Sequence, residues 1–121
     1  MRIIGENPRF SEDLEGYDII GESVSEGDKR LYLDKLRYAA ENADSLISSG
    51  FNAEFYDFYG VDKSRVSSSE EMCERLIFES FVMVLEQGTI ECCVYNREFM
   101  PGHFIELVWD YNWNLQSTWI N

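Results

Sequence analysis

The chain has 121 residues and carries 23 Asp and Glu against 10 Lys and Arg, which gives a formal net charge of -13 at pH 7. A hydrophobic content of 45% argues against disorder, and this length predicts a single domain over residues 1–121. The charge disfavours direct binding to nucleic acids and to anionic membranes, and the longest apolar run, Phe81–Leu85, is too short to cross a bilayer.

The first helix is predicted to begin near Ser25. The Ser25 hydroxyl can cap the helix, while Asp28, three residues later, completes the spacing of a capping box. Gly50 is the expected end of the helix. Apolar residues with helical spacing mark its buried face: Leu36, Ala39, Ala40, Ala43 and Ile47. The segment that follows, 51–59, is compatible with either a strand or a short helix.

A second helix is predicted to start at Ser68 or Ser69. Acidic residues are favoured near the positive end of a helix, and here they are Glu70, Glu71 and Glu74. The later half of this helix, Leu76–Phe78 and Phe81–Leu85, is apolar on nearly all sides, which indicates that this half is central and buried.

After Gly88 the apolar residues recur at every second position, which is typical of strands. Two sets alternate in this way: Ile90, Cys92 and Val94, and then Ile105, Leu107 and Trp109. Met100–Gly102 is predicted to turn the chain, Asp110–Asn114 to form a tight connection, and Leu115–Ile120 to form the closing strand. The sequence therefore predicts an α+β fold with two main helices packed on a C-terminal antiparallel β-meander.

The residues that carry most enzyme and metal chemistry are few. The only histidine, His103, follows Pro and Gly in a turn, where a surface position is commoner than a catalytic one. The spacing of the three cysteines, Cys73, Cys92 and Cys93, matches no zinc site, and the acids match no EF-hand loop. We therefore expect no enzyme, no metal and no cofactor, and reduced thiols in a cytoplasmic protein.

Acidic and aromatic residues are interleaved in two stretches, 54–59 and 109–113. Phe55, Phe58 and Trp109 are expected to fill the core. The others have the composition of a protein-binding patch, in which rings anchor and carboxylates engage Lys or Arg of the partner. The predicted charge contacts are Asp13, Glu15, Asp18, Glu54, Asp57 and Asp110, and the predicted anchors are Tyr56, Tyr59 and Trp113.

Three segments carry a resemblance to a known family: Gly88–Cys92, Met100–Glu106 and Asp110–Asn114. Together with size and charge, they make the last third of the chain similar to immunity proteins of bacterial contact-dependent growth inhibition systems. These small acidic proteins neutralise the nuclease toxin domain that a neighbouring cell delivers. The resemblance implies a cytoplasmic protein without catalysis that binds a cognate cationic nuclease toxin domain and occludes its active site.

Two other functions stay open. An acidic nucleic-acid mimic or regulatory adaptor would bind a DNA-binding protein. A small hydrolase would use Cys93 as the nucleophile and His103 as the base. The sequence decides neither the toxin's identity nor the oligomeric state.

Overall fold

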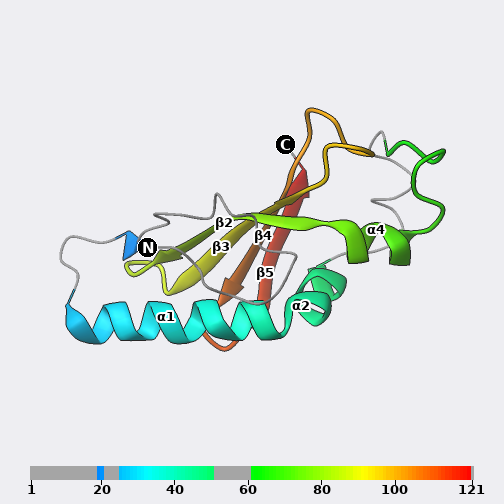
Figure 1. Cartoon of the computed structure of the whole chain (residues 1–121). Coiled ribbons are helices and arrows are strands. Elements are labelled where there is room, and N and C mark those ends of the chain that lie inside the picture. The colour runs from blue at the N-terminus through cyan, green and yellow to red at the C-terminus, as the bar shows by residue number, and fades with distance from the viewer. Residues whose placement is uncertain (1–18, 21–24, 51–60, 121) are drawn as a thin grey trace.

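The computed structural model describes residues 19–20, 25–50 and 61–120. The fold is α+β: N-terminal helices are followed by a four-strand antiparallel meander (Figure 1). The described helices are α1 (Glu26–Glu41), α2 (Ala43–Gly50) and the short α4 (Ser69–Arg75). The described strands are β1 (Ile19–Ile20), β2 (Ile77–Val84), β3 (Thr89–Tyr95), β4 (Ile105–Asp110) and β5 (Leu115–Ile120). They form one sheet in the order β1-β2-β3-β4-β5, in which β1 runs parallel to β2 and the other neighbours are antiparallel.

The start of α1 is capped as the sequence predicted. Ser25 Oγ accepts a hydrogen bond from the backbone N–H of Asp28 (3.1 Å), and the Asp28 carboxylate accepts one from the backbone N–H of Ser25 (3.3 Å). The helix does not run unbroken to Gly50, because Asn42 caps α1 with a non-helical backbone (φ −119°) and α2 follows. All five residues predicted for the apolar face are buried.

The prediction of a buried helix between Leu76 and Leu85 was wrong. A helix does begin after Ser68, whose Oγ accepts from the N–H of Glu71, but this helix ends at Arg75. The chain becomes extended at Leu76 and continues as β2. Val82 and Val84 lie on one face of β2 while Phe81 and Met83 are buried on the other, so the strand lacks the polar alternation that identifies a strand from sequence.

From Gly88 onward the predicted meander is confirmed. The two alternating sets face each other across the β3–β4 pair: Ile90 lies opposite Trp109, Cys92 opposite Leu107 and Val94 opposite Ile105. All six side chains are at most 1% exposed. Gly88 (φ 65°), between β2 and β3, and Gly102 (φ 79°), in the turn predicted at Met100–Gly102, supply left-handed backbone.

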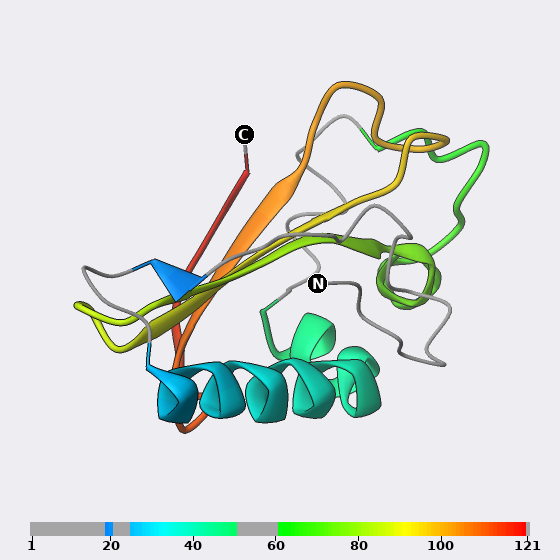
Figure 2. The same cartoon turned by 60° about the vertical axis from the view of Figure 1, so that its left-hand side comes forward.

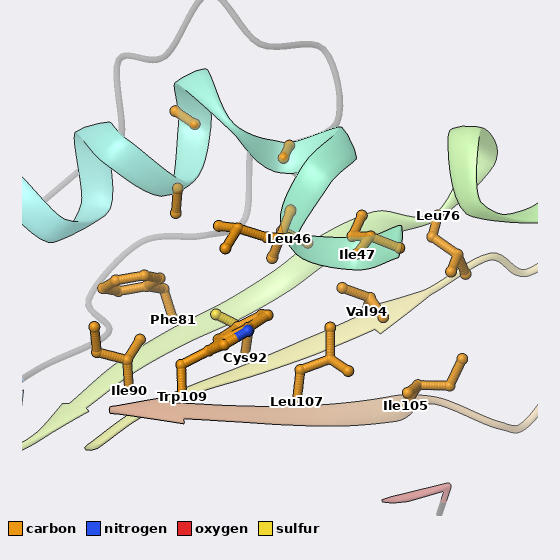
Figure 3. Close-up of a cluster of buried hydrophobic side chains, with 14 of the residues drawn as sticks. Leu46, Ile47, Leu76, Phe81, Ile90, Cys92, Val94, Ile105, Leu107 and Trp109 are labelled. Atoms are coloured by element: carbon orange, nitrogen blue, oxygen red, sulfur yellow. The ribbon is translucent and has the colours of Figure 1, made fainter. Parts of the chain in front are cut away.

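The helices α1 and α2 lie on one face of the sheet, and the core fills the space between (Figures 2 and 3). Phe81 of β2 meets Tyr32 of α1 edge-on, with ring centroids 5.6 Å apart. At the end of α2, Gly50 approaches β4 so closely that a Cβ there would lie 2.5 Å from Leu107 Cδ2. The opposite face of the sheet carries neither α1 nor α2.

Candidate functional site

The face of the sheet that points away from α1 and α2 is the candidate site, and we call it the open face. Strand register aligns its residues in rows that cross β2, β3, β4 and β5. One row consists of Ser80, Cys93, Glu106 and Trp119, and the next of Val82, Glu91, Val108 and Ser117. These eight residues are half-buried or exposed.

The strands that form the open face contain carboxylates and no basic residue. Glu79, Glu91, Glu106 and Asp110 lie in β2, β3 and β4, and there is no Lys, Arg or His in these strands or in β5. No ion pair joins Glu79, Glu91 or Glu106 to a base within the described part of the chain. The charged side chains that these four strands contribute are therefore all acidic, and a described base close to them, Arg97, lies over the Tyr95 ring at the end of β3 (5.6 Å).

The ion pairs of the described residues lie elsewhere. Arg75 bridges Glu71 (3.5 Å) and Glu98 (2.5 Å), and the remaining pairs are Lys29–Glu26 and Arg65–Asp62. They are mostly solvent-exposed and connect helix turns or neighbouring loops. Among the residues that the structure describes, none of these pairs includes Glu79, Glu91 or Glu106.

The carboxylates of the open face influence one another and the thiol beside them. Burial raises the pKa of Glu106, and the nearby charge of Glu91 raises it further. The pKa of the Cys93 thiol is also raised, first by burial and then by the charges of Glu106, Glu79 and Glu91, against a hydrogen bond with Ser80. An approaching cation would relieve this crowding of negative charge.

Apolar side chains accompany these charges. Trp119 is 48% exposed and lies directly opposite Glu106 across the β4–β5 pair. In the next row, Val82 and Val108 flank Glu91. Because residues directly opposite on paired strands have Cβ atoms about 4.5–5.5 Å apart, a partner side chain can contact Trp119 and Glu106 together.

The loop between β4 and β5 contains Trp113, one of the two predicted contacts that the structure describes. Its ring stacks on Tyr38 of α1, with centroids 4.9 Å apart and planes inclined by 20°, and meets Trp109 edge-on at 5.8 Å. Lys35 donates a hydrogen bond to the carbonyl of Tyr111 and places its Nζ 6.0 Å from the Trp113 ring centroid. Trp113 is half-buried, while Tyr38 is 42% exposed.

The second described contact, Asp110, stabilises this loop. Its Oδ1 accepts from the backbone N–H groups of Asn112 (2.8 Å) and Asn114 (2.9 Å), and its Oδ2 accepts from Asn114 Nδ2 (3.0 Å). The hydrogen bonds from Asn114 are the main reason why the pKa of Asp110 is lowered. Asp110 thus keeps its charge at the end of the open face while its oxygens hold the turn.

The other seven predicted contacts lie outside the described residues: Asp13, Glu15, Asp18, Glu54, Tyr56, Asp57 and Tyr59. The same holds for segment 51–59 as a whole and for the expected core residues Phe55 and Phe58. The sequence reasoning did not select Glu79, Glu91, Glu106 or Trp119 as contacts. A signal was present, because the last 24 residues, 98–121, contain no Lys or Arg.

The environment of Cys93 is unfavourable for a nucleophile. A catalytic thiol needs a lowered pKa so that the thiolate forms near neutral pH, whereas burial and three carboxylates raise the pKa of Cys93. His103 is exposed in the predicted turn, where its backbone N–H donates to the carbonyl of Met100 (3.2 Å). The geometry gives the Cys93–His103 hydrolase no support.

Comparisons of the chain with protein-family models, with curated proteins and with solved structures found no match. Within the described ranges, no group of three or more His, Cys, Asp and Glu side chains is arranged to hold a metal ion. No helix in those ranges combines the length and the apolar character needed to span a membrane. The function is therefore inferred from the chain's own residues.

Proposed function

We propose that this chain is a cytoplasmic immunity protein that binds a cognate cationic nuclease toxin domain and neutralises it by occluding its active site. The observation that carries the proposal is the open face, where β2, β3 and β4 supply Glu79, Glu91 and Glu106 and no strand supplies a base. A nuclease binds a polyanion and therefore presents positive charge around its active site. The carboxylates of the open face are complementary to the cationic groups with which such a nuclease binds its polyanionic substrate.

Charge and apolar contact have separate roles in this proposal. Electrostatic steering raises association rates by roughly 10–10³, and close charge pairs at interfaces couple by about 1.5–7 kcal/mol. Affinity also needs buried apolar anchors, which cluster in the well-packed centre of an interface. Trp119 supplies an exposed indole beside Glu106.

The predicted contact Asp110 belongs to the same proposed contact surface, whereas Trp113 packs on Tyr38 of α1, on the helix side of the sheet, and stays a separate predicted anchor. Asp110 ends β4 opposite Thr89, on the side of the open face. Trp113 is held by Tyr38 and Trp109, so its ring has little conformational entropy to lose on binding. The seven predicted contacts outside the described residues extend this proposal.

The test is the salt dependence of binding to the nuclease domain encoded beside the chain's gene. We expect association to slow as salt rises, because screening weakens steering. The double variant Glu91→Gln/Glu106→Gln should associate more slowly and respond less to salt. Glu70→Gln/Glu74→Gln, two exposed residues on α4, removes the same charge elsewhere and is the matched control.

Three outcomes contradict the proposal. The first is a complex that is insensitive to salt, and the second is an equal loss in both double variants. The third is a neighbouring gene that encodes no toxin. Binding of the chain to several unrelated DNA-binding proteins would instead favour an acidic nucleic-acid mimic, which the same open face would serve.

A further inference from the structure

The outer edge of β5 has no role in the fold described so far. β5 is the last strand in the sheet order, so β4 pairs with one of its sides and no described strand pairs with the other. Four of its six residues are exposed: Leu115, Gln116, Ser117 and Trp119. Edge strands usually carry a charge, often Lys, or a Pro that blocks pairing with another chain. Leu115–Ile120 contains neither.

We propose that two copies of this chain pair through the outer edges of β5, antiparallel about a two-fold axis. The composition of the strand favours a second copy over a cationic partner. β2, β3 and β4 each carry at least one carboxylate, whereas β5 carries no charge. A cationic partner gains no ion pair from β5, while two copies of a chain with net charge -13 meet there without like charges directly opposite.

The remaining repulsion depends on the distance from β5 to the nearest carboxylates of the open face. Glu106 lies on β4, one strand behind the edge. Neighbouring strands are about 4.8 Å apart, so the β4 strands of the two copies would be separated by three spacings, about 14 Å. The Debye length is about 8 Å at 0.15 M salt and about 30 Å at 0.01 M. Repulsion across the dimer is therefore screened at physiological salt and strong at low salt.

The pairing has a definite consequence for the open face. A two-fold axis perpendicular to the sheet keeps both open faces on the same side, with the two Trp119 residues flanking the junction. The β4–β5 register shifts between Val108 and Trp109 and is regular from Ser117 to Ile120, so pairing is expected over this regular part. A dimer formed in this way presents one continuous acidic surface. The inference itself does not depend on the toxin.

The test measures the mass of the purified chain in solution, by sedimentation equilibrium from micromolar to millimolar protein. Dimerisation should strengthen between about 0.01 M and about 0.15 M salt, which is opposite to the trend expected for a cationic partner. Ser117→Lys places a like-charged pair at the junction and should abolish the dimer. Gln87→Lys, an exposed residue in the β2–β3 turn, makes the same charge change and should dimerise like the parent chain.

The inference is overturned by a chain that stays monomeric at every concentration, or by a dimer that weakens as salt rises. It is also overturned if folded Ser117→Lys dimerises like the parent chain, because a different surface is then involved. If the chain is monomeric and toxin binding is lost in Ser117→Lys but not in Gln87→Lys, the edge of β5 pairs with a strand of the toxin instead. None of these outcomes bears on the proposed role of the open face, which is tested separately by the salt dependence of toxin binding.

Discussion

The ring of Trp113 stacks on the ring of Tyr38, with centroids 4.9 Å apart, while the Trp113 backbone holds a φ of 64°. This left-handed conformation costs a residue other than glycine about 1–2 kcal/mol. An aromatic pair contributes about 0.5–1.5 kcal/mol beyond the area that it buries. The contacts of Trp113 with Tyr38 and Trp109 therefore offset a strained backbone.

The first prediction compares Trp113→Ala with Trp113→Gly. Both variants lose the ring contacts and should unfold at lower urea concentration than the parent chain. Glycine relieves the strain and alanine does not, so Trp113→Gly should be the more stable of the two by about 1 kcal/mol. Equal stability of the two variants would mean that the backbone at this position is not strained.

A second prediction concerns Glu106→Gln and pH. Burial and Glu91 raise the pKa of Glu106 above its usual 4.5, so between that pH and the raised value the native state binds more protons than the unfolded state. The stability contribution of this carboxyl therefore falls as pH rises through that window. Glu106→Gln should be more stable than the parent chain near neutral pH, by up to about 0.5 kcal/mol, and the difference should close below the window.

Urea unfolding at several pH values measures this difference. Glu70→Gln is the control, because Glu70 lies in the first turn of α4, where a carboxylate is favourable. It should lower stability slightly near neutral pH. A stability difference for Glu106→Gln that does not change with pH would show that ionisation is not its cause.

The third prediction is slow alkylation of Cys93. Because its pKa is raised above 9.0, the native thiol should react with iodoacetamide slowly at neutral pH and faster as pH increases. Peptide mapping by mass spectrometry identifies the labelled cysteine, and Cys93→Ser is the control. Rapid stoichiometric labelling of Cys93 at neutral pH would contradict the structure and revive the hydrolase.

The fourth prediction concerns the close approach of α2 to β4. Gly50→Ala places a methyl group 2.5 Å from Leu107 Cδ2, and overpacking of this kind costs about 1–3 kcal/mol. Gly27→Ala is the matched control, because a Cβ there meets only Ser25 Oγ at 3.7 Å and alanine favours a helix by up to about 1 kcal/mol. Unfolding should show opposite signs for the two variants. A stabilised Gly50→Ala would mean that Leu107 moves aside at no cost.

Local signals predicted those parts of the fold that depend on neighbouring residues. The capping box needs only Ser25 and Asp28, and the meander needs only alternation and turns. β2 was misassigned because both of its faces are largely apolar, which periodicity alone cannot distinguish from a buried helix.

The candidate site was less accessible from the sequence because it depends on strand register. Alternation places Glu91 and Glu106 on the polar sides of two strands, but only pairing shows that they share one face with Trp119. Asp110 was selected for its charge, and its hydrogen bonds to Asn112 and Asn114 follow only from the loop conformation.

The parallel pairing of β1 with β2 affects how the sheet assembles. Ile19 lies beside Met83, roughly sixty residues later, whereas β2 to β5 pair in the order in which they occur along the chain. Closing a long loop costs more entropy than closing a hairpin. We therefore expect β1 to dock last and detach first, so that Ile19–Ile20 can leave the sheet while β3, β4 and β5 keep their pairing.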